Sequence, residues 1–259
     1  MTAWLASVSS RCDAGVDDRP PGDGVAGSTN LATTYDRIGA HGREALTSGH
    51  VSIDPLPVDG QERWGISVVL RPRWTDALAS AVATLEALSA DDSFVYGPAN
   101  LHLTIRQLEN YREPVLEGDD RVRSYVDVLA DFARHRPPIE IGFRGLTVGT
   151  GGALLQGWPC EDLQATRLAL HRALVRGGVA IEGPERTIER LRTTAHATLS
   201  IFDRQPGNAA DVLAFCEAHR GTSFGTQTFD ELCLVGYRRG PRSVRLTAYG
   251  RFALRGIPR

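Results

Sequence analysis

Two stretches of the chain repeat the same alternation of polar and apolar residues. "HLTIRQLENY" begins at residue 102 and "HATLSIFDRQ" begins at residue 196, and each opens on His, an apolar residue, Thr and an aliphatic residue. Residues two apart in a β-strand share a face. Each stretch is therefore predicted to be a strand that buries its aliphatic side chains and presents an imidazole and a hydroxyl on the opposite face.

The elements around these two strands also repeat. The first set is an apolar strand at 65–70, a helix that Thr75 caps, the first His strand, a helix at about 120–135 and a hairpin at 139–158. The second set is a helix at about 161–176, the second His strand at about 194–202, a helix near 208–219 and a hairpin at about 228–254. The order helix, His strand, helix, hairpin thus occurs twice, which indicates an internal repeat.

The N-terminal region differs in pattern from this repeat. Residues 1–28 are rich in Asp, Gly, Pro and Ser without an apolar period and predict a disordered extension. Residues 29–63 are expected to form a helix, from Thr33 to Ser48, and a Pro-punctuated connector. The folded domain is expected at 64–259, in two lobes. The extra helix either covers a groove and selects a small substrate over RNA, or packs outside.

Composition narrows the class of partner. The chain has 259 residues, 42% hydrophobic and 23% charged, and a formal net charge of -2. A protein that coats a polyanion is strongly basic, so any contact with nucleic acid is expected to be a local site. All 29 basic residues are Arg, a bias from which we draw no functional conclusion.

The cysteine pattern and the absence of targeting signals favour a cytoplasmic location. The four cysteines form no C-x-x-C pair and no metal-finger spacing, so free thiols are expected. The first residues lack the basic and apolar regions of a signal peptide. No stretch approaches the ~20 apolar residues of a membrane helix. We expect no membrane association, and the sequence indicates no protein partner.

Two opposed strands that each present His and Thr suit the cleavage of a phosphodiester without a metal. One neutral imidazole takes a proton from the attacking water or hydroxyl, and a protonated imidazole gives one to the leaving oxygen. The Thr hydroxyls donate to the non-bridging phosphate oxygens. An ordinary His pKa near 6.5 would allow both roles around neutral pH. Two isolated triplets would be a weak signal, but their place inside a repeated order of elements favours function.

The motifs carry a family resemblance. "GPANLHLTI" and "TTAHATLSIF" resemble the two motifs of the two-histidine (2H) phosphoesterase superfamily, which includes 2',5' RNA ligase-like proteins and RNA 2',3'-cyclic phosphodiesterases, over roughly residues 64–254. The resemblance implies an α+β, bilobal, pseudo-twofold fold of two antiparallel sheets that face a central groove, with helices outside. It implies His102 and His196 as the catalytic pair, Thr104 and Thr198 on the phosphate, and no metal or organic cofactor.

Past the motifs the two strands differ, which bears on the substrate. Strict alternation places Arg106 on the groove face of the first strand, and Ser200 and Phe202 on that of the second. Arg106 could pair with phosphate and Phe202 could stack on a base. Equally, Arg106 could be solvated and Phe202 could fill the interface between the lobes. Tyr96 is a further stacking candidate.

Together with these residues, the resemblance implies a metal-independent enzyme that acts on a 2',3'-cyclic phosphate or a 2',5'-phosphodiester of a nucleotide or RNA end. One alternative is a pathway-specific or defence-related 2H enzyme that acts on a small nucleotide or a cyclic oligonucleotide. Another is a module that binds nucleotide or RNA without turnover. His and Thr at both motifs favour the enzyme, since a binder needs no pair of proton-transfer groups.

Overall fold

The computed structural model describes residues 26–53, 63–89, 92–112, 118–179, 181–240 and 243–256. Its helices are α1 (Ala26–Ser48), α2 (Asp76–Ser89), α3 (Asp120–Arg134), α4 (Leu163–Arg176), α5 (Ala209–Ala218) and the short 3-10 helix η1 (Ile188–Arg190). Its strands are β1 (Arg63–Leu70), β2 (Ser93–Val95), β3 (Leu103–Arg112), β4 (Ile139–Gly149), β5 (Gly152–Pro159), β6 (Ala195–Thr198), β7 (Ser200–Phe202), β8 (Ser223–Phe229), β9 (Glu231–Gly240) and β10 (Ser243–Ala253).

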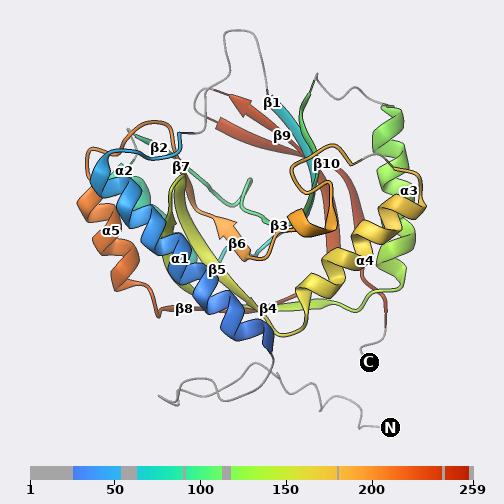
Figure 1. The fold of residues 1–259 in the computed structure, drawn as a ribbon, viewed down its shortest axis with the longest axis horizontal. Helices are drawn as coiled ribbons and strands as arrows, with labels where there is room; N and C mark the ends of the chain where they lie inside the picture. Colours follow the sequence, from blue (N-terminus) through green and yellow to red (C-terminus); the bar gives the residue numbers. More distant parts are fainter. Residues whose placement is uncertain are drawn as a thin grey trace.

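Eight of these strands form one curled antiparallel sheet in the order β10-β9-β1-β3-β6-β5-β4-β8 (Figure 1). We call β10-β9-β1-β3 the first half and β6-β5-β4-β8 the second half. The halves meet where β3 pairs with β6, at Leu103 and Ala197. The predicted α+β fold with two antiparallel lobes is confirmed, and its two lobes are continuous through the pair of His strands.

Each half combines strands from both sequence repeats. The hairpin β4–β5 follows the first His strand in sequence but pairs with β6, whereas β9–β10 follows the second His strand and pairs with β1. Figure 1 shows α3 and α4 beside the first half, and α1, α2 and α5 beside the second. Neither half is a contiguous segment of the chain. Each half therefore forms only when strands that are far apart in the sequence pair with one another.

The helices follow the patterns that predicted them. Thr75 accepts a hydrogen bond from the backbone N–H of Leu78, at 3.3 Å, as a helix N-cap does. Asp119 accepts from two backbone N–H groups at the start of α3. The apolar side chains of α2 recur at helical spacing and are buried, with Leu78, Val82 and Leu85 in the main core. These helices therefore pack by their apolar faces against the sheet.

The start of the N-terminal helix differs from the prediction in the residues that the structure describes. Residues 1–25 of the expected extension lie outside the described residues, as does most of the connector. However, α1 begins at Ala26, within the stretch expected to be disordered, and not at Thr33. Figure 1 shows α1 running across β4 and β5, and the hydroxyl of Tyr35 on α1 donates to the backbone oxygens of Gly157 and Ala195, so this helix packs directly on the sheet.

The expectation of free thiols holds only in part. Cys216 and Cys233 are buried free thiols. Cys160 is disulfide-bonded, so the expectation is wrong there. Cys12 lies outside the described residues. In the part of the chain that the structure covers, no helix is long and apolar enough to cross a bilayer.

Candidate active site

The two His-x-Thr motifs lie side by side at the centre of the sheet. Because β3 and β6 are antiparallel and pair at Leu103 and Ala197, His102 lies beside Thr198, and Thr104 lies beside His196. All four side chains line one cavity of about 280 Å³. The structure therefore brings together the four residues that the sequence marked as catalytic candidates, with each imidazole next to the hydroxyl of the other motif.

The imidazole of His102 is held by the turn that precedes it. Its Nδ1 lies 2.8 Å from the backbone oxygen of Asn100, so Nδ1 donates and Nε2 keeps a free lone pair. The Asn100 side chain accepts from the N–H of Gly97 at 2.7 Å and donates to the oxygen of Val244 on β10 at 3.1 Å. The Asn of the first motif thus fixes the turn that orients the first imidazole.

The imidazole of His196 is held differently. Its Nδ1 lies 2.9 Å from the hydroxyl of Thr194, and its Nε2 lies 3.4 Å from Nη1 of Arg192. Nε of Arg192 lies 3.2 Å from the buried carboxylate of Glu185. The carboxylate thereby anchors the guanidinium at the edge of the cavity, with a terminal nitrogen next to the second imidazole.

Arg192 is a site residue that sequence reasoning missed. It lies in the irregular segment between η1 and β6, where no periodicity marks a face. Among the described residues that line the cavity, it is the one Arg, and none is Asp or Glu. The cavity therefore offers one fixed positive charge beside its two imidazoles, an arrangement that suits an anion.

Both imidazoles are neutral in the free protein at neutral pH. Burial lowers the pKa of His102 to about 4. Burial, followed by the guanidinium of Arg192, lowers the pKa of His196 to about 3. Desolvation disfavours the charged imidazole, and a nearby cation disfavours it further. The expectation of two ordinary pKa values is therefore wrong, and a proton-donating imidazole requires the added negative charge of a bound ligand.

Arg106 does not lie on the groove face. The register of β1 and β3 pairs Val69 with Thr104 and Val68 with Arg106, which leaves Ile105 as an extra, bulged residue. Arg106 is fully buried, and its guanidinium contacts Nδ1 of His171 at 2.7 Å. The bulge moves Gln107, instead of Arg106, onto the cavity. The predicted groove position of Arg106 is wrong, and so is the alternative of a solvated side chain.

The second strand loses its alternation in a similar way. The predicted strand is interrupted at Leu199. Before this residue the chain forms β6 of the large sheet, and after it the chain forms β7, which pairs with β2. Ser200 is buried, and its hydroxyl accepts from the N–H of Ala153 at 3.2 Å. Phe202 is buried in the main core. Ile201 lines the cavity instead, so the predicted groove positions of Ser200 and Phe202 are wrong.

Two tyrosines flank the first imidazole. Tyr96 lines the cavity, and its ring centroid lies 5.9 Å from that of His102. Tyr237 on β9 approaches His102 from another side, at 5.0 Å between centroids. Its buried hydroxyl interacts with Ser67 and Thr104 but forms no hydrogen bond of ordinary geometry. Burial raises the pKa of Tyr237 to about 12, so the hydroxyl is a proton-bearing donor.

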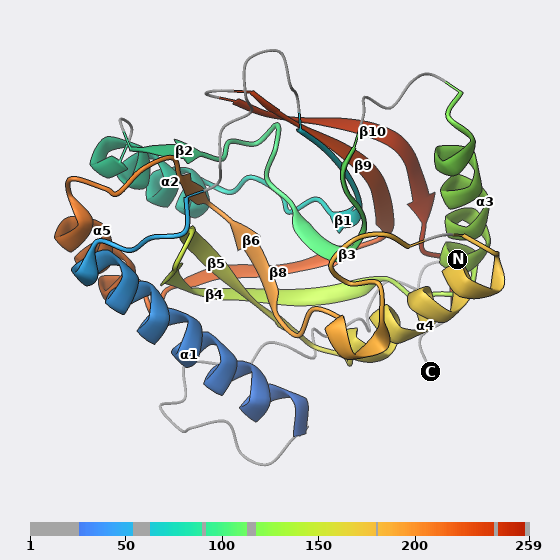
Figure 2. The same cartoon turned by 45° about the horizontal axis from the view of Figure 1, so that its top comes forward.

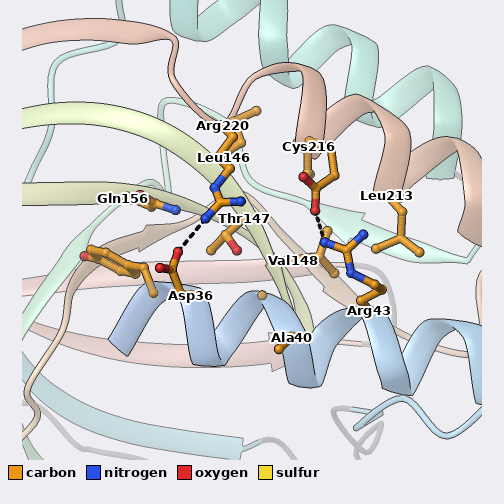
Figure 3. Close-up of a pocket in the computed structure, with 13 residues that line it drawn as sticks. Asp36, Ala40, Arg43, Leu146, Thr147, Val148, Gln156, Leu213, Cys216 and Arg220 are labelled. Atoms are coloured by element: carbon orange, nitrogen blue, oxygen red, sulfur yellow. Dashed lines mark hydrogen bonds and ion pairs between the residues drawn. The ribbon is translucent and has the colours of Figure 1, made fainter. Parts of the chain in front are cut away.

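A second pocket lies away from these residues, between α1 and α5 at the edge of β4 (Figure 3). Its volume is about 120 Å³. Two ion pairs cross it, Arg43 with Glu217 and Arg220 with Asp36. None of the described residues that line it is a His, and the ion pairs join α1 to α5 and to the turn that follows α5, so we interpret it as a packing gap. Within the described ranges no group of three or more His, Cys, Asp or Glu is arranged to hold a metal ion.

Comparison with known proteins supports the fold. No family model and no curated protein matches the sequence. The chain shares its fold with TT0787 of Thermus thermophilus (TM-score 0.54, 16% identity, 75% of this chain and 100% of that one). E. coli LigT in apo form (TM-score 0.46, 13% identity, 74% and 98% covered) and a protein described as a phosphoesterase (TM-score 0.46, 16% identity, 74% and 99% covered) are more distant matches. At these identities the likeness shows the fold alone.

Proposed function

We propose that this protein is a phosphoesterase that acts on a 2',3'-cyclic phosphate or a 2',5'-phosphodiester of a nucleotide or RNA end. The observation that carries the proposal is the pair of imidazoles in one cavity. Each has Nδ1 tied by a hydrogen bond to its own segment of the chain, so Nε2 is the reacting nitrogen in both, and Nε2 of His196 also lies 3.4 Å from Nη1 of Arg192. Two such groups provide the general base and the general acid that the reaction needs.

The surroundings of the imidazoles suggest their roles. The guanidinium of Arg192 next to Nε2 of His196 disfavours the imidazolium there, so His196 acts as the base and His102 as the acid. Nε2 of His196 takes a proton from water, and the water oxygen forms a bond to phosphorus. The bond from phosphorus to the leaving ribose oxygen breaks, and that oxygen takes the proton on Nε2 of His102. The product is a phosphate monoester and a free hydroxyl.

The charge of the substrate completes the site. Both imidazoles are neutral before binding, and a phosphodiester carries one negative charge. This charge raises the pKa of the nearby imidazoles, so His102 can take up the proton that it later donates. Thr104, Thr198 and Arg192 donate hydrogen bonds to the non-bridging oxygens, where charge accumulates in the transition state.

The test is hydrolysis of nucleoside 2',3'-cyclic phosphates and 2',5'-linked dinucleotides in EDTA, with His102→Asn and His196→Asn in parallel. We expect turnover in the chelator and a loss of about 10³-fold in each variant. Activity that the chelator abolishes, or that either variant retains, contradicts the proposed chemistry. Nucleotide binding without turnover of any tested ester would instead favour the binding module.

A further inference from the structure

A buried arginine on α4 contacts both His strands. Helix α4 lies beside the first half of the sheet in both views (Figure 1 and Figure 2), and Arg167 on its buried face is 1% exposed. Its Nε donates to the backbone oxygen of Ile105 at 3.0 Å. Its Nη2 donates to the backbone oxygens of Thr104, at 3.1 Å, and Thr194, at 2.7 Å. Its Nη1 donates to the backbone oxygen of Arg192 at 2.8 Å. One guanidinium thus joins β3 to the segment that leads into β6.

These contacts use every donor of the guanidinium. The remaining N–H of Arg167 donates to Oε1 of Gln164, about one turn earlier on α4, at 3.2 Å. Arginine has five N–H donors, so none is left unpaired, and all five acceptors are uncharged oxygens. Burial lowers the pKa of Arg167 to about 10, so the group stays charged at neutral pH. A buried cation is costly unless it is hydrogen-bonded, and here the backbone of the two His segments supplies most of the acceptors.

The guanidinium lies where the two His strands separate. The ladder between β3 and β6 consists of a single pair, Leu103 with Ala197. Beyond it the backbone oxygens of Thr104 and Ile105 both bond to Arg167. Successive oxygens of a regular strand point to opposite edges, whereas the bulge at Ile105 turns two of them toward one group. The guanidinium therefore takes the place of the next rungs of the ladder, and the spacing of the strands depends on it there.

Three of the backbone contacts belong to residues of the site. Thr104 lines the cavity. The hydroxyl of Thr194 lies 2.9 Å from Nδ1 of His196, and Nη1 of Arg192 lies next to Nε2 of the same imidazole. Arg167 itself does not line the cavity, so any effect that it has on the reaction passes through these neighbours.

From these contacts we infer that Arg167 is a positioning residue, which sets the spacing of the two His strands so that both imidazoles reach one phosphate. The inference rests on the proposed function and adds to it a residue outside the cavity. Lys at this position would keep the charge but would offer three donors from one nitrogen, which cannot span the same four backbone oxygens. The role therefore needs the planar fork of Arg and not only its charge.

Steady-state kinetics of Arg167→Lys measures the positioning. We expect kcat on a nucleoside 2',3'-cyclic phosphate to fall about 100-fold, because a small displacement of reacting groups costs about this much. KM should change by less than about threefold, because the groups that bind the phosphate remain.

The matched control is Leu170→Ala on the same helix, which removes a fully buried side chain that has no hydrogen-bonding group. It should lower the melting temperature and change kcat by less than about threefold. If Arg167→Lys also lowered only the melting temperature, and kept its kcat at a temperature at which it is folded, the residue would be merely structural and the inference would be overturned.

A second measurement needs no turnover and separates this inference from the proposed function. NMR follows the imidazoles of His102 and His196 while inorganic phosphate is added. We expect phosphate to shift the signals of both imidazoles in the intact protein but of only one in Arg167→Lys, because the strands are no longer held at the same spacing. Equal shifts of both imidazoles in the variant would overturn the role of Arg167 alone. Phosphate that shifts neither imidazole in the intact protein would overturn the proposed function as well.

A milder variant, Gln164→Met, covers the case in which Arg167→Lys does not fold. Gln164 accepts from the same Nη1 that contacts the backbone of Arg192, so its loss leaves this nitrogen with one acceptor. We expect kcat to fall about threefold, as for one weakened hydrogen bond, with KM unchanged. A kcat equal to that of the intact protein would overturn the inference.

Discussion

The two halves of the sheet carry the same motif but use it in different surroundings. In both strands the groove face is occupied by His, by Thr two residues later and by a residue five positions after the His, which is Gln107 in one half and Ile201 in the other. The first imidazole is oriented by a backbone oxygen, and the second by a hydroxyl and a guanidinium. The positions on the groove face thus repeat in the two halves, whereas the groups that contact the two imidazoles differ.

The largest expected effect distinguishes the two imidazoles. If His102 is the acid, His102→Asn should lose about 10³-fold in kcat on a ribose leaving group but less than about tenfold on a 4-nitrophenyl phosphodiester, whose leaving group needs no proton. His196→Asn should lose about 10³-fold on both, because the base is needed in each case. Steady-state kinetics on the two esters checks this, and the reverse pattern would exchange the two roles.

The next effect concerns the guanidinium of Arg192, which lies next to Nε2 of His196. Arg192→Gln should lower kcat/KM by about 100-fold, since a charged hydrogen bond to the phosphate is lost. It should also raise the pKa of His196, because a neighbouring cation no longer disfavours the imidazolium. Kinetics and an NMR titration of the imidazole measure the two changes, and the exposed Arg190→Gln serves as the control. An unchanged pKa of His196 would contradict the role of Arg192.

A smaller effect tests the burial that the two imidazoles share. Their pKa values are lowered to about 4 and about 3, so between these values and 6.5 the unfolded chain binds more protons than the folded one. Stability should therefore rise with pH over this window and fall on acidification. From pH 6.5 to pH 5 the loss should be about 1.5 kcal/mol for each imidazole. Urea unfolding of the protein and of the double variant His102→Asn/His196→Asn measures it. Parallel pH profiles would contradict the lowered pKa values.

The smallest effect compares two buried tyrosine hydroxyls, that of Tyr35 on α1 and that of Tyr237 on β9. Tyr35→Phe should lower the free energy of unfolding by about 1 kcal/mol, because its hydroxyl bonds to the backbone of β5 and β6. Tyr237→Phe should leave stability nearly unchanged, because its hydroxyl has no hydrogen bond of ordinary geometry. Thermal unfolding of both variants tests this, and an equal loss in the two would contradict the assigned contacts.

The amino-acid pattern alone determined the elements and the four central residues. Helices repeat every 3.6 residues and strands every two, so apolar stripes such as Leu78, Val82 and Leu85 can be recognised without knowing their partners. The two His-x-Thr triplets were recognisable for the same reason. Both lie at the start of a strand, before any irregularity, so their shared face follows from local geometry.

The tertiary structure decided what surrounds those four residues. The bulge at Ile105 and the break at Leu199 each shift the alternation, and both arise where a strand meets its partners, which a local pattern cannot show. Gln107 and Ile201 therefore replaced Arg106 and Phe202 on the groove face. Arg192 lies in a segment without periodicity, and α1 lies over the second half through contacts with strands more than a hundred residues away in sequence. Long-range packing thus decided that the positive charge of Arg192 lies in the cavity and that α1 covers the second half of the sheet.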